Sequence, residues 1–277
     1  MNVCSPNVKL QDNYTCFDHY ELAQIAKAYN SYIKRKALCD KNTCAVRNNI
    51  AIQNKSKKEL WNSIHKVLNT LCDNEYCWIQ LDFLNNIPDQ SLRNKLQLFT
   101  FKPQTTPKLR SWLNTQDINN VLQQYQELDP SFYYLGALPS DFYLHAPFNF
   151  NKLKSKKIKS IGIVLNHDKH NQPGSHWVAL FVDVPNKTIE YFDSTGGKPN
   201  KRICEFIHFL NKRVFKNKFV YKENKRKHQY ENYACGIYSI FFIVQRLLGR
   251  TFDDITNNII KDKEITKYKQ HLFRPRV

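Results

Sequence analysis

Glycine is scarce in this chain, with 7 residues in 277. No three of them follow the G-x-G-x-x-G spacing of dinucleotide-binding loops, and none fits the G-x-x-x-x-G-K spacing of a P-loop. These spacings matter because only glycine lets the backbone approach a phosphate closely. We therefore expect neither a dinucleotide-binding fold nor a P-loop nucleotide triphosphatase.

Long apolar runs are also missing. The longest one, Gly236 to Val244, is well short of the roughly 20 residues that cross a bilayer as a helix. Met1 to Gln11 lacks the apolar core of a secretory signal peptide. We therefore expect a soluble, intracellular protein without membrane insertion.

Cysteine is too sparse for a disulfide scaffold, with eight residues in the whole chain, so we expect reduced thiols. Two C-x4-C pairs, Cys39 with Cys44 and Cys72 with Cys77, could together bind zinc. Spacers of two residues are commoner at zinc sites, and buried thiols are the alternative interpretation. The sequence leaves open whether these four cysteines bind metal.

Positive charge is abundant: 42 Lys and Arg against 24 Asp and Glu give a formal net charge of +18. The segment 198–227 alone carries 11 basic and 2 acidic residues. This charge predicts attraction to polyanions at low salt, although an AT-rich coding sequence would also enrich lysine. We interpret this segment and Lys152 to Lys159 as solvated surface, and leave nucleic acid open as an accessory partner.

Apolar residues at helical spacing predict helices over Tyr20 to Lys36, Leu60 to Leu71 and Asp117 to Leu128. The first two indicate that the N-terminal region is mostly helical. Hydrophobic residues make up 42% of the chain, which is enough for a core and excludes general disorder.

Two β-rich segments, His176 to Val184 and Thr188 to Asp193, are separated by a turn and predict a hairpin. Ile161 to Leu165 predicts a further short strand. If the turn centres on Pro185 and Asn186, paired residues have numbers that sum to about 371. That register brings the His176 imidazole and the Asp193 carboxylate to the same end of the hairpin.

Cys235 to Gly249 reads as a helix that is apolar on nearly every face, which is typical of a helix buried in the centre of a domain. Cys235 stands at its N-terminus, where the helix dipole favours thiolate over thiol. A polar, irregular loop that contains Gln229 precedes it.

These residues together supply the parts of a cysteine-dependent acyl-transfer site. Cys235 is the candidate nucleophile, His176 the candidate acid and base, and Asp193 the carboxylate that orients the imidazole. The backbone N–H of Cys235 and the amide of Gln229 are candidate donors to an oxyanion. Each residue taken singly has an ordinary structural explanation, but their conjunction is harder to explain in that way.

The spacing is recognisable as well. His176-Trp177, the acid 17 residues later, and Gln229 six residues before Cys235-Gly236 resemble the ubiquitin-like-protein-specific cysteine proteases. That clan contains the SUMO-deconjugating enzymes and the adenovirus maturation protease. Trp112-Leu-Asn resembles the opening of the same catalytic domain.

The surroundings of the candidate histidine and acid, and the terminal His271-Leu-Phe-Arg, resemble a viral branch of this clan more closely. It comprises the polyprotein-processing proteases of large nucleocytoplasmic DNA viruses, such as that of African swine fever virus. Like those enzymes, the chain carries an upstream Cys…Cys-Trp element, here Cys72 to Trp78.

The resemblance implies an α+β fold of the papain-like, adenain-like type, with a mixed sheet packed on a buried central helix. It also implies a helical arm domain over residues 1–94 and a catalytic domain over residues 95–277. Substrates would be polyprotein precursors cut after Gly-Gly-Xaa, in the virus factory of the host cytoplasm and in the virion. Trp177, Trp112 and Gly236 would contact the substrate; no metal or other cofactor is implied, although DNA could act as an accessory activator.

Three alternatives stay open. The first is a deconjugase that removes SUMO or another ubiquitin-like tag from host proteins, and the second is acetyl transfer through Cys235. The third is a basic nucleic-acid-binding protein with an inert protease-like fold. The pair His167-x-x-His170 could suggest a metal site, but we interpret both as loop residues because no third ligand is near in sequence. The oligomeric state does not follow from the sequence.

Overall fold

The computed structural model describes residues 3–6, 14–39, 49–104, 108, 110–145 and 157–274. The chain divides into two compact units, residues 1–102 and residues 103–277, which we call the helical unit and the catalytic unit. The boundary expected between residues 94 and 95 stays a prediction.

One long helix and several shorter ones build the helical unit around one apolar core. The core contains the periodic residues Leu22, Ile25 and Tyr29 of the first helix, together with Leu60 and Ile64 of the second. Both predicted helices are therefore confirmed. The described elements of this unit are α1 His19–Cys39, α2 Lys57–Leu68, α3 Glu75–Trp78, the 3-10 helix η1 Asp82–Asn86, α4 Gln90–Asn94 and the π-helix η2 Lys95–Phe99.

Two disulfides, Cys4–Cys16 and Cys72–Cys77, cross-link the helical unit, so the expectation of reduced thiols is wrong for these four residues. Six of the eight cysteines precede residue 78, and an average over the whole chain hides this local density. Because Cys72 and Cys77 are bonded to each other, they are not available to a four-cysteine metal site. The side chain of Cys39 and all of Cys44 lie outside the described residues.

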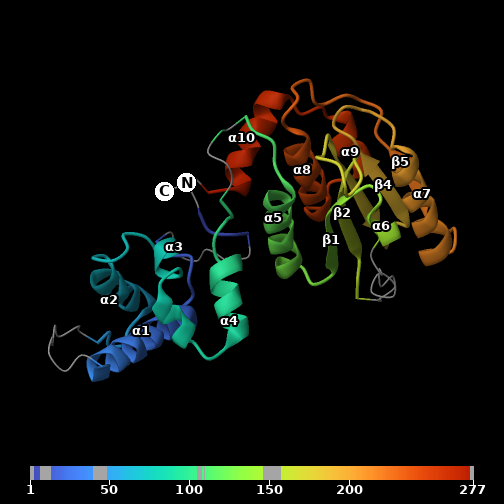
Figure 1. Ribbon diagram of the computed structural model, residues 1–277. Helices are drawn as coiled ribbons and strands as arrows, with labels where there is room; N and C mark the ends of the chain where they lie inside the picture. The colour runs from blue at the N-terminus through green and yellow to red at the C-terminus, as the bar shows by residue number, and fades with distance from the viewer. Residues whose placement is uncertain are drawn as a thin grey trace. The chain divides into compact units, whose positions relative to one another are not determined.

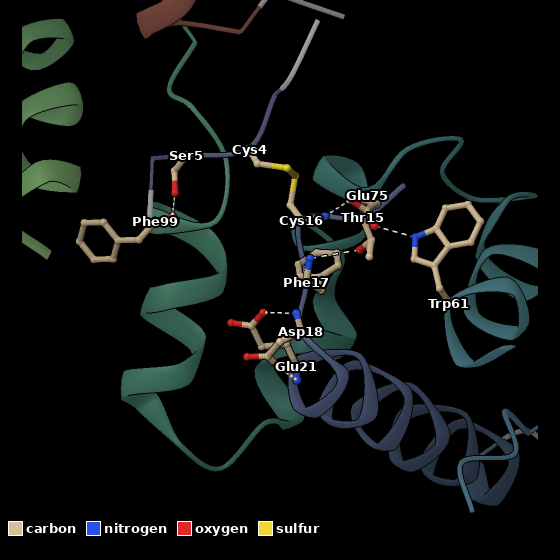
Figure 2. Close-up of a disulfide and its surroundings, with 10 residues drawn as sticks. All are labelled: Cys4, Ser5, Thr15, Cys16, Phe17, Asp18, Glu21, Trp61, Glu75 and Phe99. Atoms are coloured by element: carbon tan, nitrogen blue, oxygen red, sulfur yellow. Dashed lines mark hydrogen bonds between the residues drawn. A yellow bond between two sulfur atoms is a disulfide. The ribbon is translucent and has the colours of Figure 1, made fainter. Parts of the chain in front are cut away.

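A half-buried carboxylate supports the Cys4–Cys16 bond (Figure 2). Glu75 accepts a hydrogen bond from the backbone N–H of Cys16 at 3.1 Å and another from the Trp61 indole at 2.6 Å. One side chain thus connects the first disulfide to α2 and to the segment of the second disulfide.

A five-stranded mixed sheet organises the catalytic unit, with strand order β1-β2-β3-β4-β5 (Figure 1). The outer pairs β1/β2 and β4/β5 are parallel, whereas β2/β3 and β3/β4 are antiparallel. The strands are β1 Phe132–Pro139, β2 Ser160–Asn166, β3 Trp177–Asp183, β4 Thr188–Phe192 and β5 Val220–Glu223. The helices are α5 Thr115–Leu128, α6 Phe142–His145, α7 Lys201–Phe209, the π-helix η4 Leu210–Val214, α8 Cys235–Leu247, α9 Phe252–Asn257 and α10 Asp262–Leu272.

Both faces of the sheet are buried, which explains why its central strands are almost uniformly apolar. Along β3, Ala179 and Phe181 belong to the core that contains α8, whereas Val178 and Leu180 belong to the core that contains α7. Figure 1 shows α5 and α8 on one side of the sheet and α6 and α7 on the other. The expected α+β architecture, a mixed sheet on a buried central helix, is confirmed.

The C-terminal end of α8 is held to the sheet by charge. Arg246 lies 2.6 Å from Glu190 on β4 and 2.8 Å from Asp183 on β3, and all three side chains are largely buried. The guanidinium also stacks over Phe181. These contacts hold α8 against β3 and β4. The candidate residues His176 and Asp193 lie next to the opposite end of this strand pair.

None of the helices in the described ranges is both long and apolar enough to span a membrane. Most of the lysine-rich stretch Lys152 to Lys159 lies outside those ranges, so its expected exposure stays a prediction.

Candidate active site

The β3–β4 hairpin brings together the two residues that the sequence places at one of its ends. The strands pair Ala179 with Phe192 and Asp183 with Thr188, so the predicted register sum of 371 is confirmed. His176 directly precedes β3 and Asp193 directly follows β4. The His176 Nε2 atom lies 2.7 Å from Asp193 Oδ1 and donates to it.

Asp193 is almost completely buried and held from several sides. Its Oδ1 accepts hydrogen bonds from the backbone N–H and the hydroxyl of Thr195, both at 2.8 Å. Asn224 accepts from the backbone N–H of Asp193 at 2.8 Å and donates to its carbonyl at 2.7 Å. Burial opposes ionisation, but the hydrogen bonds and the charge of His176 outweigh it and lower the pKa of Asp193 below its usual value.

Cys235 is the first residue of α8 and is 2% exposed. Its thiol is close enough to His176 to contribute to the raised pKa of that ring. The Nε2 atom of His176 is already committed to Asp193, so Nδ1 is the ring nitrogen left for the thiol. Among the described residues, no side chain caps α8, because Ala234 stands at its N-cap. The backbone N–H groups of the first turn are therefore left for another acceptor.

The environment of His176 favours the protonated ring. Burial opposes the charge, but hydrogen bonds with Asp193 and Cys235 and the negative charge of both partners outweigh this effect. Together they raise the pKa of His176 to about 9. Near neutral pH the site can therefore hold a protonated imidazole between the Asp193 carboxylate and the Cys235 sulfur, and a neighbouring imidazolium is one of the groups that activate a cysteine nucleophile.

Gln229 is oriented by two partners with different hydrogen-bonding capacity. Ser194 Oγ donates to Gln229 Oε1 at 2.6 Å, and Gln229 Nε2 donates to the carbonyl of Glu231. A carbonyl can only accept, so this contact fixes which end of the amide carries the protons. The amide has a second N–H, which can donate to an oxyanion.

Of the three residues expected to contact the substrate, Trp177 and Gly236 are buried and Trp112 is exposed. Trp177 is 7% exposed and its indole N–H donates to the carbonyl of Leu113 at 3.0 Å. A Cβ on Gly236 would lie 3.1 Å from Leu113 Cβ and 3.4 Å from Trp177 Cδ1, so the first turn of α8 approaches both closely. Trp112 is 46% exposed.

Sequence reasoning missed the residues that hold the site in place. The role of Asn224 could not be predicted from neighbouring residues, because it contacts Asp193 across 31 residues of sequence. Ser194 was visible beside the acid, and its carbonyl accepts the backbone N–H groups of both His228 and Gln229 at 2.8 Å. The dipeptide Asp193-Ser194 therefore orients both the imidazole and the candidate oxyanion donor.

His167 and His170 lie in a loop, as expected, but further metal-ligand types do lie close to His170. His167 donates its backbone N–H to the His176 carbonyl, and the two rings meet edge to face with centroids 5.1 Å apart. His170 Nδ1 instead lies 2.8 Å from Asp141 Oδ2, and His145 lies beside it. The further ligand-type residues come from a distant part of the chain, where spacing along the sequence could not reveal them.

Cys235, His176 and Asp193 form the arrangement expected of a cysteine protease, and known proteins that resemble this chain carry that name. A thiol protease of Acanthamoeba polyphaga mimivirus is 33% identical over 285 residues, covering 99% of this chain and 94% of that protein. A cysteine protease of African swine fever virus is 28% identical over 247 residues, covering 80% of this chain and 90% of that protein.

The crystal structure of the protease pS273R of African swine fever virus, 20% identical in sequence, shares the fold with a TM-score of 0.66. The match covers 99% of this chain and 96% of that one. The Ulp1 protease family, C-terminal catalytic domain, matches residues 96–275. The chain therefore belongs to the Ulp1 protease family and is a cysteine protease.

Proposed function

We propose that this protein is a viral endopeptidase that cleaves structural polyprotein precursors after Gly-Gly-Xaa during virion maturation. The observation that carries the proposal is the hydrogen bond from His176 to Asp193, with the same imidazole next to Cys235 at the start of a buried helix. The similarity to viral proteases along nearly the whole chain supports a viral rather than a cellular role.

In the proposed reaction, the Cys235 thiolate attacks the scissile carbonyl carbon and the carbonyl electrons move to oxygen. The N–H of Cys235 and the amide of Gln229 stabilise this oxyanion. When the intermediate collapses, the C–N bond breaks and the leaving amine takes a proton from His176. Water then attacks the thioester, gives its proton to His176, and releases the thiolate.

Preference for glycine has a steric basis in this proposal. An added Cβ on Gly236 would lie 3.1 Å from Leu113 Cβ, which is tighter than ordinary packing, and 3.4 Å from Trp177 Cδ1. In the proposal the substrate strand passes over this turn of α8 in a narrow passage, where residues without Cβ would fit best.

The N-termini produced from a candidate precursor polyprotein test the proposal. We expect cleavage after Gly-Gly-Xaa by the wild-type protein, no cleavage by Cys235→Ala, and no cleavage when both glycines of the precursor are replaced by alanine. Cleavage at sites without glycine would overturn the specificity, and full turnover by Cys235→Ala would overturn the mechanism.

Deconjugation of a ubiquitin-like protein is the second candidate, because related proteins of several African swine fever virus isolates are named SUMO-1 cysteine proteases. A SUMO fusion offered beside the viral-type precursor separates the two functions. Preferential cleavage of the fusion would favour deconjugation.

We also propose that nucleic acid binds the basic surface of residues 198–227 as an accessory partner in the virus factory and the virion. Exposed residues such as Lys201, Lys212, Lys225 and Arg226 support this proposal. Affinity for DNA should fall steeply with added salt, because bound cations are released from the phosphates. Absence of binding, or binding that is indifferent to salt, would contradict it.

A further inference from the structure

We propose that Asp141, His145 and His170 bind a zinc ion that ties α6 to the loop leading into His176. Asp141 Oδ2 lies 3.2 Å from His145 Nε2 and 2.8 Å from His170 Nδ1, and all three ligand atoms lie within 4.8 Å of one another. Two imidazoles and one carboxylate are ligands that zinc accepts, and a site with three protein ligands leaves a position for water.

The spacing of these atoms suits a metal. Tetrahedral zinc with ligands at about 2.0–2.1 Å places neighbouring ligand atoms about 3.3 Å apart. The carboxylate oxygen already stands close to this separation from each nitrogen, so small side-chain rotations would complete the geometry. The rings of His145 and His170 have centroids 4.2 Å apart, so one ion placed between them would be within reach of a nitrogen from each ring.

The backbone holds the ligands in place from two elements. Asp141 and His145 are four residues apart across α6, so they lie on one face of that turn. Asp141 is 3% exposed, and its Oδ1 accepts the backbone N–H of His170 at 2.9 Å. Ser140 donates its backbone N–H and its hydroxyl to the carbonyl of Asp168. Such supporting hydrogen bonds are typical around metal ligands.

The site is accessible to an ion from solvent, because the His145 and His170 side chains are 52% and 50% exposed. Its position also connects it to the candidate active site. The same loop carries His167 against His176, and the Asp168 carboxylate accepts hydrogen bonds from Gly174 and Ser175 just before His176. A metal would therefore stiffen the segment that positions the candidate base.

Zinc titration of the full-length, tag-free protein after chelation tests this inference. The Cys235→Ala form is used so that zinc cannot bind the active-site thiolate, and Cys204→Ser is added because that free thiol is exposed. We expect one zinc ion per chain, a higher Tm, and slower hydrogen exchange in residues 167–175.

Single substitutions in the same background locate the ion. His145→Ala and His170→Ala should each weaken zinc binding by about tenfold or more, because even supporting residues contribute that much. His208→Ala, at an exposed histidine on α7, should leave the affinity unchanged. The two cluster residues are half exposed, so we expect these variants to fold, and circular dichroism checks this.

Cobalt gives an independent readout, because tetrahedral coordination to nitrogen and oxygen produces a visible absorption spectrum that solvated cobalt lacks. Absence of zinc binding would overturn the inference and leave the cluster as two hydrogen bonds to one carboxylate. Equal affinity in the His145→Ala, His170→Ala and parent proteins would place the ion elsewhere and would overturn it as well. Neither outcome bears on the proteolytic function, which is measured in the protein with an intact Cys235.

Discussion

The helical unit and the catalytic unit are stabilised by different means. The helical unit consists of helices around one core and contains both disulfides of the described chain. The catalytic unit has a sheet buried on both faces, a buried central helix and a charge network, and its two described cysteines are free. Its thiol chemistry is thereby available for catalysis, whereas thiol chemistry in the helical unit is used for cross-linking.

The sharpest test of this division is Cys235→Ala. We expect peptide turnover to fall by about 10⁴-fold or more, because the nucleophile is lost. The free energy of unfolding of both units should change little, since the substitution removes a single buried sulfur atom. Cys204→Ala, at the exposed free cysteine, serves as the control and should retain full activity.

Arg246→Ala tests whether a buried charge network replaces covalent links in the catalytic unit. Removing the guanidinium leaves Asp183 and Glu190 without their cation, which typically costs about 3–5 kcal/mol of unfolding free energy. Urea denaturation measures the loss. Arg250→Ala breaks a partly exposed pair with Asp254 and should have little effect, so equal losses would contradict the assignment.

Gln229→Ala tests the candidate oxyanion donor. We expect kcat to fall by about 10²-fold with little change in stability, which steady-state kinetics and a melting curve together would show. Ser194→Ala should give a smaller fall, because it frees the amide to rotate without removing it. An unchanged kcat in Gln229→Ala would move the oxyanion contact to other groups.

Breaking the Cys4–Cys16 disulfide tests how much covalent cross-linking stabilises the helical unit. The bond closes a loop of 12 residues in sequence separation, so Cys4→Ser with Cys16→Ser should lower the unfolding free energy of the helical unit by about 2–3 kcal/mol. Hydrogen exchange should show faster opening in residues 14–39 and unchanged protection of β3 and α8. Loss of protection throughout the catalytic unit would contradict the independence of the two units.

The pH profile should show the smallest of these effects. His176 has a raised pKa of about 9, so its contribution to stability is complete below about 6.5 and is lost as pH rises through about 9. We expect kcat/KM to decline with that same ionisation, since the leaving amine needs its proton. Asp193→Asn should shift this basic limb downward by about one pH unit or more, because the ring keeps its hydrogen bond but loses the charge.

Asp193→Ala should damage kcat more than Asp193→Asn, because alanine cannot orient the imidazole. Asp253→Asn, at an exposed aspartate paired with Lys222, is the control and should leave the basic limb in place. Equal damage from both substitutions at Asp193 would show that the charge rather than the orientation matters.

Periodicity and spacing predicted the central parts of the catalytic unit well. The hairpin register followed from a turn of known position, and the apolar pattern of α8 identified a helix buried on all sides. β1 and β5 were not predicted, and β5 has two exposed residues, so burial leaves little alternation there. The disulfides, Asn224 and the Asp141 cluster depend on contacts between distant residues, which local patterns do not encode.

The late position of α8 in the chain has a consequence for synthesis on the ribosome. The strands that carry His176 and Asp193 emerge before the helix that packs on them and bears Cys235. Until α8 is made, α5 covers that face of the nascent sheet only in part and no nucleophile exists. Because chains fold progressively as they emerge, the site cannot become competent before α8 has been translated, so the growing polypeptide is protected from its own activity.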